Sequence, residues 1–212
     1  MAATYEQISA YHAFLSQHDD PVLKRMEVEA ARDRFPIIGP AAGKFCYLMA
    51  RATGARRIFE LGSGYGYSTL WFARAVRENG GGVVHHTVWD EELSRRARAN
   101  VGEAGYEDLV QFHVAEAVQT LMDAEGPFDI IFNDIDKDGY PASLPVMKEK
   151  LRVGGLILID NMIWHGAIFD PSDQTPATQG VREFTHRLMA DTDFLFQLIP
   201  VRDGIIAALR VA

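Results

Sequence analysis

The segment Glu60-Leu61-Gly62-Ser63-Gly64-Tyr65-Gly66 follows an apolar run, RIFEL at 57–61, and precedes a helical pattern, YSTLWFARAV at 67–76. A glycine-rich turn between a strand and a helix is where open α/β sheets bind nucleotide-like ligands. Glycines allow the backbone to approach the ligand, and free N–H groups at a helix start favour a carboxylate or phosphate. A dinucleotide-binding fingerprint would need a third glycine at position 67, where the chain has tyrosine. The segment therefore predicts a nucleotide-like ligand other than a dinucleotide, and the alternative is a turn that binds nothing.

Short β-forming runs alternate with helical patterns from Arg57 onward. Besides the first run, they are GVVHHTVW at 82–89, LVQFHVA at 109–115, FDIIFND at 128–134 and GLILID at 155–160. Nearly continuous apolar runs of this kind indicate parallel strands covered by helices on both faces. Near the end, FLFQLIPV at 194–201 and GIIAALRV at 204–211 flank an Asp-Gly turn, which predicts a β-hairpin. We expect an α/β fold with a mostly parallel, seven-stranded sheet that contains one antiparallel strand.

The composition is that of one globular domain. A chain of 212 residues, 48% hydrophobic and 24% charged, encloses a single core, so we expect one domain over 1–212 with a helical cap at 1–34. A helix is expected at about 181–190, after the loop FDPSDQTPATQG. The net charge of −8 disfavours nucleic acid and acidic membranes as partners. The lone Cys46 predicts a small core residue. No apolar stretch approaches the roughly 20 residues of a membrane span, and we expect a cytoplasmic protein.

Acidic residues follow two of the predicted strands. Asp134 comes directly after FDIIFN, and Asp160 with Asn161 follows GLILI. Adjacent parallel strands would bring these side chains together at the carboxyl edge of the sheet. Their oxygens are hard ligands that suit Mg²⁺. The alternative is that each acid caps the helix that follows it.

These motifs together resemble the cation-dependent O-methyltransferases of the caffeoyl-CoA and catechol type. The resemblance runs from about Phe35 to the C-terminus, through IIGPAAGKF, ELGSGYGYST, DEELSRRARAN, FNDIDKDGY, GGLILIDNMIWHG, VREF and DGI. FNDIDKDGY and IDNMIWHG are its specific part, because methyltransferases in general share only the glycine loop. The resemblance implies a Rossmann-like methyltransferase fold, S-adenosylmethionine as donor, a divalent cation, and a homodimer.

The resemblance also implies roles for individual residues. It assigns Asp134, Asp160 and Asn161 to the metal and Lys137 to a catalytic base. Gly62, Tyr67 and Ser68 match positions that line the methionine end of the donor. We expect the rest of the donor site to comprise Ile38, Glu60, Ser63, Gly64, Asp90, Glu116 and Asp134.

Two positions depart from the family pattern. Val88 stands where related enzymes carry the acid that binds the donor ribose, so we expect another partner for the ribose, with Asp90 as a candidate. Glu116 either contacts the adenine or faces solvent. Thr185 replaces an asparagine that the family often has on the substrate side.

The expected reaction is methyl transfer to one hydroxyl of a catechol-like diphenol. A phenol with a pKa of roughly 10 is a poor nucleophile until a cation or a base stabilises its anion. Lys137 would take the proton, and Trp164 would line the aromatic substrate, although it could instead be simply packed. Two alternatives remain at this point: a degenerate module that binds nucleoside or metal without turnover, and a nucleic-acid methyltransferase, which the charge disfavours.

Overall fold

A seven-stranded sheet forms the centre of the molecule, in the order β3-β2-β1-β4-β5-β7-β6. The computed structural model describes residues 4–212, apart from the side chain of Tyr5. The strands are β1 (Arg57–Leu61), β2 (Val83–Val88), β3 (Val110–Val114), β4 (Phe128–Asn133), β5 (Leu151–Ile159), β6 (Phe194–Ile199) and β7 (Ile205–Arg210). β1 to β5 pair in parallel, whereas β7 is antiparallel to both β5 and β6. The predicted fold, including its one antiparallel strand, is confirmed.

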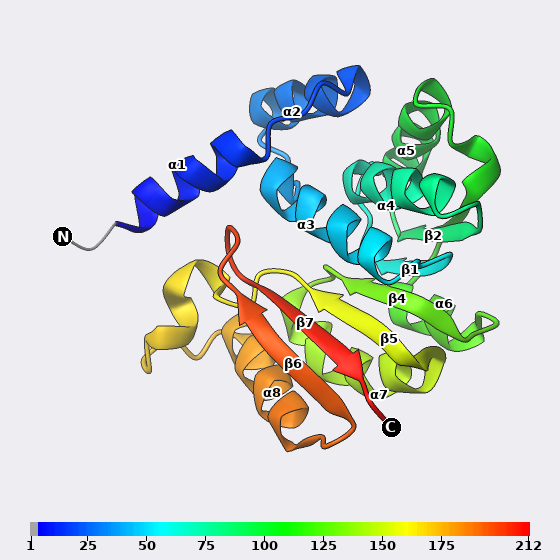
Figure 1. Cartoon of the computed structure of the whole chain (residues 1–212). Helices are drawn as coiled ribbons and strands as arrows, with labels where there is room; N and C mark the ends of the chain where they lie inside the picture. Colours follow the sequence, from blue (N-terminus) through cyan, green and yellow to red (C-terminus); the bar gives the residue numbers. More distant parts are fainter. Residues whose placement is uncertain (1–3) are drawn as a thin grey trace.

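Helices cover both faces of this sheet (Figure 1). One face carries α2 (Pro21–Asp33), α3 (Gly39–Ala52), α4 (Tyr67–Glu78) and α5 (Glu91–Glu103). The other carries α6 (Ala117–Asp123), α7 (Tyr140–Lys150) and α8 (Pro176–Ala190). Successive strand residues alternate between the two cores: Ile58 and Ile130 face the first group of helices, and Phe59 and Ile131 the second. Cys46 is buried in the first core, where burial raises the pKa of its thiol.

The N-terminal segment contains two helices. α1 (Tyr5–Leu15) begins with Thr4, whose side chain accepts from the Gln7 N–H in a capping box. α2 begins with Asp20 as its N-cap, followed by proline at the first helical position. α1 projects from the body of the molecule, whereas α2 lies over α4 and α5 (Figure 1). Among residues 4–212, no helix combines the length and the apolar character that a membrane span needs.

Two boundaries differ from the sequence prediction. α8 begins at Pro176, five residues before the predicted start, because proline is compatible with the first turn of a helix. β5 begins at Leu151 and continues through Gly154 and Gly155, with an irregular register against β4. The first difference places residues of a predicted loop within a helix, and the second lengthens a predicted strand at its start.

Candidate functional site

The glycine segment forms a turn that leaves β1 and enters α4 at the carboxyl edge of the sheet. Gly62 has a positive φ of 83°, and a Cβ there would lie 2.6 Å from the backbone oxygen of Asp134. Only glycine allows these two chain segments to approach so closely. Ser63 ties the turn to the next strand, since its N–H donates to Thr87 O (2.9 Å) and its hydroxyl accepts from Thr87 N–H (3.0 Å). The turn is thus fixed between β2 and β4.

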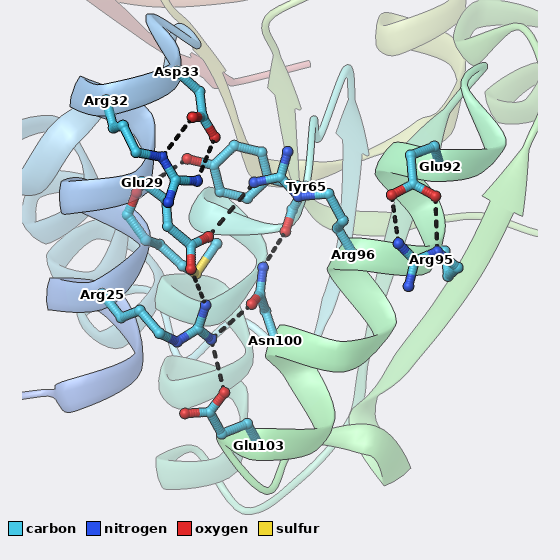
Figure 2. Close-up of polar contacts among 11 residues, drawn as sticks. Arg25, Glu29, Arg32, Asp33, Tyr65, Glu92, Arg95, Arg96, Asn100 and Glu103 are labelled. Carbon is cyan, nitrogen blue, oxygen red and sulfur yellow. Dashed lines mark hydrogen bonds and ion pairs between the residues drawn. The ribbon is translucent and has the colours of Figure 1, made fainter.

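Tyr65 anchors the same turn to α2 and α5 (Figure 2). Its hydroxyl donates to Met26 O at 3.1 Å, and its backbone oxygen accepts from Asn100 Nδ2 at 3.0 Å. The guanidinium of Arg96 lies over its ring, 4.4 Å from the centroid. Arg25 of α2 joins the network by donating to Asn100 Oδ1 at 2.9 Å. Residues distant in sequence therefore hold the donor-side turn in place.

A buried polar chain lies directly beneath the turn. Thr69 Oγ1 donates to Glu60 Oε2 at 2.6 Å and lies 3.0 Å from His86 Nδ1. The Thr69 hydroxyl therefore bridges the carboxyl group of Glu60 and the imidazole of His86. Burial raises the pKa of Glu60 to about 7, against the opposing effect of hydrogen bonds from Ser68 and other hydroxyls, and burial lowers the pKa of His86 to about 3. The chain connects the end of β1 to the first turn of α4.

The other predicted donor residues surround this turn. Ser68 and Tyr67 are buried at the start of α4, and the Tyr67 hydroxyl donates to Glu27 Oε1 of α2 at 2.6 Å. Ile38 is buried just before α3 begins. Gly64 faces the ring of Phe35, which a Cβ at that glycine would approach to 3.2 Å. The structure brings these four predicted residues to the same end of the sheet.

The half-buried Asp134 and the buried Lys137 form an ion pair where β4 ends. Lys137 Nζ donates to Asp134 Oδ1 at 2.8 Å and to Ile135 O at 3.0 Å, and the lysine side chain is only 8% exposed. The ammonium group also lies 5.0 Å from the ring centroid of Tyr140 and 5.7 Å from that of Trp164. Burial raises the pKa of Asp134, and the Lys137 ammonium opposes that effect. Trp164 therefore lies beside the predicted base, in a left-handed backbone conformation after β5.

Asp160 and Asn161 follow the adjacent strand β5. Asp160 is 2% exposed, and its Oδ1 has no hydrogen-bond partner within the described part of the chain. Burial, with the Asp134 carboxylate as the second cause, raises the pKa of Asp160 to about 7. Two carboxylates that disfavour each other's ionisation in a buried site suit a bound cation. Within residues 4–212 there is no cluster of three or more His, Cys, Asp or Glu side chains for a metal ion; the predicted set comprises two carboxylates and one amide.

Asp203 holds the segment that contains Asn161, whereas its sequence context predicted only a turn. Its Oδ2 accepts from Asn161 Nδ2 at 3.2 Å, and its Oδ1 accepts from His165 N–H at 2.6 Å. The backbone of the same hairpin tip accepts from Met162 and Ile163. Nearby, Arg202 Nη1 donates to Ile37 O at 2.8 Å, before α3. The DGI motif was the only signal in the sequence that this tip belongs to the site.

The acids after β2 and β3 serve as helix caps. Asp90 Oδ1 accepts from Leu93 N–H at 2.7 Å at the start of α5. Glu116 uses both oxygens at the start of α6, accepting from Val118 N–H (3.0 Å) and Gln119 N–H (2.6 Å). Thr185, the other departure from the family pattern, donates within α8 to Val181 O. A binding role for Asp90 or Glu116 would compete with capping.

Comparison with known proteins identifies the family. A model of the O-methyltransferase family matches residues 12–211. A catechol O-methyltransferase of Niastella koreensis is 33% identical, with 97% of each chain covered. The O-methyltransferase TomG of Streptomyces achromogenes, solved with SAM, has a TM-score of 0.86 at 29% identity and covers 97% of this chain and 96% of its own. An O-methyltransferase from Bacillus cereus, solved with SAH, has the same TM-score and identity, with 96% of each chain covered.

These matches extend over nearly the whole chain, and the similar structures share its fold. They confirm the resemblance to catechol-type and caffeoyl-CoA-type enzymes that the sequence motifs indicated. The chain therefore belongs to the O-methyltransferase family.

Proposed function

We propose that the protein transfers the methyl group of S-adenosylmethionine to one hydroxyl of a vicinal diphenol with the help of a divalent cation. The observation that carries this proposal is the pair of carboxylates at the ends of adjacent strands beside the glycine turn, the half-buried Asp134 and the buried Asp160. The SAM and SAH in the similar structures and the catechol enzyme among the relatives support the donor and the substrate class.

In this proposal Asp134, Asp160 and Asn161 hold the cation. The unpartnered oxygen of Asp160, judged over residues 4–212, and the hard oxygen donors of all three residues fit Mg²⁺. When bound, a cation of this kind lowers the pKa of coordinated hydroxyls and orients both oxygens of a diphenol. Asp203 fixes Asn161 through the bond from Asn161 Nδ2.

Lys137 in its amine form accepts the proton of the attacking hydroxyl, and the resulting oxygen anion attacks the donor methyl carbon. The carbon–sulfur bond breaks as the carbon–oxygen bond forms, so the products are an aryl methyl ether, S-adenosylhomocysteine and a proton on Lys137. Trp164, 5.7 Å from the ammonium group, lines one side of the aromatic ring. Burial of Lys137 excludes water from the proton transfer.

The first experiment measures methylation of a catechol by the full chain with Mg²⁺ and then with excess chelator. We expect methyl ether formation that falls at least about 100-fold in chelator and returns with added Mg²⁺, because metal polarisation contributes several kcal/mol. A monophenol should not be methylated. Full activity in excess chelator would contradict a role for a divalent cation in the reaction.

Asp160→Asn should abolish turnover while the fold is kept, and exposed Asp123→Asn is the matched control. Binding of S-adenosylhomocysteine without turnover of any diphenol would instead support a module that has lost catalysis. We also propose a homodimer, for which α1 provides the supporting observation argued below.

A further inference from the structure

The motifs VREF at 181–184 and DGI at 203–205 both contact one loop. This acceptor loop, residues 161–175, joins β5 to α8 and contains Trp164. None of residues 163–177, all of which the structure describes, is buried, although Trp164 and Ile168 pack partly on the second core. Apolar burial therefore contributes little to the conformation of the loop, and its polar contacts decide how firmly it is held.

Asp203 of the DGI motif holds the first part of the acceptor loop. Its carboxylate, 12% exposed, accepts from His165 N–H at 2.6 Å and from Asn161 Nδ2 at 3.2 Å. Asn161, Trp164 and His165 are three of the five non-glycine residues with positive φ within 4–212, at 55°, 48° and 53°. Such conformations are strained and persist only where neighbouring groups hold them. Asp203 thus stabilises the backbone that carries the Trp164 indole.

Arg182 of the VREF motif holds the rest of the acceptor loop. Its Nη1 donates to Asp173 O at 2.7 Å, and its Nη2 donates to Ala167 O at 3.1 Å and to Asp170 O at 2.5 Å. Nε and Nη2 also share Ile168 O at 3.2 Å. One guanidinium therefore bonds to four carbonyl groups, which its planar set of five N–H donors makes possible.

The helix that carries Arg182 rests on the backbone of the predicted base. A Cβ at Gly180 of α8 would lie 2.0 Å from Lys137 O, so the two chain segments touch directly. On the other side, the Trp164 ring centroid lies 5.7 Å from Lys137 Nζ. Arg182 therefore fixes the acceptor loop relative to Lys137, on a helix that cannot shift without disturbing that residue.

We propose that Asp203 and Arg182 are positioning residues for the acceptor: they hold the acceptor loop so that the Trp164 indole stands beside Lys137 before the diphenol binds. This inference rests on the proposed function, in which Trp164 lines the aromatic ring. Within residues 4–212 the hydrogen bonds of both side chains all go to this loop, so their loss should affect the acceptor and not the donor. A loop that is ordered before binding removes the entropic cost of ordering it from the binding free energy.

The first experiment measures amide hydrogen exchange of the full chain without ligands, in peptides that cover 161–175. Arg182→Ala and Asp203→Ala should each speed exchange in this loop at least about tenfold, because local opening becomes easier. Peptides from β1 and β4 should exchange as in the original protein. Arg187→Ala is the matched control, since Arg187 lies on the same helix but bonds to Pro141 O and Glu183, outside the loop.

The second experiment measures steady-state methylation of catechol with Mg²⁺, together with calorimetric titration with S-adenosylhomocysteine. Both alanine variants should lower kcat/KM for the diphenol at least about tenfold, mostly through KM, and leave affinity for S-adenosylhomocysteine within about threefold. Arg182→Lys should not restore the rate, because an ammonium lacks the planar fork. Asp203→Asn keeps one acceptor oxygen and should show a smaller loss. These two milder variants decide the question if an alanine variant does not fold.

Different results would overturn different steps. Exchange of the acceptor loop at the original rate in both alanine variants would show that neither side chain holds it. Faster exchange with kcat/KM for the diphenol within about twofold would show that the loop does not position the acceptor. An equal loss of affinity for S-adenosylhomocysteine would indicate a general disturbance of the site. If the original protein methylates no diphenol, the proposed function is wrong, and the exchange rates still decide whether Asp203 and Arg182 hold the loop.

Discussion

Lys137 is held by groups that act on its ammonium from different directions. The Asp134 carboxylate and the Ile135 carbonyl accept hydrogen bonds from Lys137 Nζ. The ring centroids of Tyr140 and Trp164 lie within 6 Å of the same nitrogen. Lys137 is therefore an interior residue and differs from a solvated loop lysine. Two roles of Lys137, a structural ion pair and a catalytic base, can be distinguished by experiment, because only a catalytic base must release and accept a proton.

We predict that Lys137→Ala lowers kcat by about 10²- to 10⁴-fold, the range for loss of a general base. Affinity for S-adenosylhomocysteine should change much less. Lys137→Arg should not restore the rate, because arginine keeps the charge but does not deprotonate. Steady-state rates and calorimetry measure both effects, with Lys24→Ala in an exposed ion pair as the control. A kcat within a few fold of that of the original protein, or a full rate in Lys137→Arg, would exclude Lys137 as the general base.

At the scale of elements, His85 of β2 and His113 of β3 form a stacked pair. Their rings are 5.3 Å apart with an interplanar angle of 3°, and Nδ1 of His85 lies 3.1 Å from Nε2 of His113. One ring donates and the other accepts, so the accepting imidazole must be neutral. Burial lowers the pKa of both, to about 4 for His85, with the charge of His113 as a second cause there. Protonation of this pair at acidic pH therefore destabilises the folded state.

We predict that the contribution of His85 to the free energy of unfolding falls as pH decreases from about 6.5 to about 4, whereas Glu60 and Asp160, whose folded pKa values are raised, contribute a slope of the opposite sign. The folded pKa of His85 lies below its unfolded value of 6.5, so the unfolded state binds more protons in this window and gains stability on acidification. At about 1.4 kcal/mol per pKa unit, His85 accounts for as much as about 3 kcal/mol. Urea denaturation at several pH values measures the slope. Relative to the original protein, the stability lost on acidification should be smaller in His85→Phe and the same in exposed His186→Gln, because His86 and His113 contribute in every variant. An equal slope in all three proteins would contradict the assignment.

The strands and the acids that follow them could be predicted from the sequence, because apolar runs and the residues at their ends are local signals. The start of α8 could not, since Pro176 and its polar neighbours are typical of both a loop and a helix N-terminus. The contacts of Tyr65 with α2 and α5, and of Asp203 with Asn161, join residues 35 to 42 positions apart. Such pairings depend on tertiary packing, for which one sequence carries no local pattern. The position of Asp90 just before a helical pattern was a local signal for capping of α5. The ribose contact expected of Asp90 would compete with that capping bond.

At the scale of the whole molecule, α1 differs from the other helices in how little of it is covered. It extends away from the body of the protein (Figure 1) and packs mainly on α3. Ile8, Tyr11, Phe14 and Leu15 are all exposed, and the rings of Tyr11 and Phe14 stack 6.4 Å apart. Clustered apolar side chains on a projecting helix mark an interaction surface, which supports a second copy of this chain as the partner.

We predict that the protein is a homodimer and that α1 contributes to its interface. Tyr11→Ser with Phe14→Ser should shift the mass measured by light scattering from twice the monomer value towards 23.6 kDa, because the substitution removes apolar area that dimerisation would bury. Leu195→Ser with Leu198→Ser on β6 is the matched control, since it removes exposed apolar side chains from a different surface. The control should leave the mass unchanged. If the original protein has the monomer mass at micromolar concentration, no dimer forms. If the β6 variant dissociates and the α1 variant does not, the edge strand forms the interface in place of the helix.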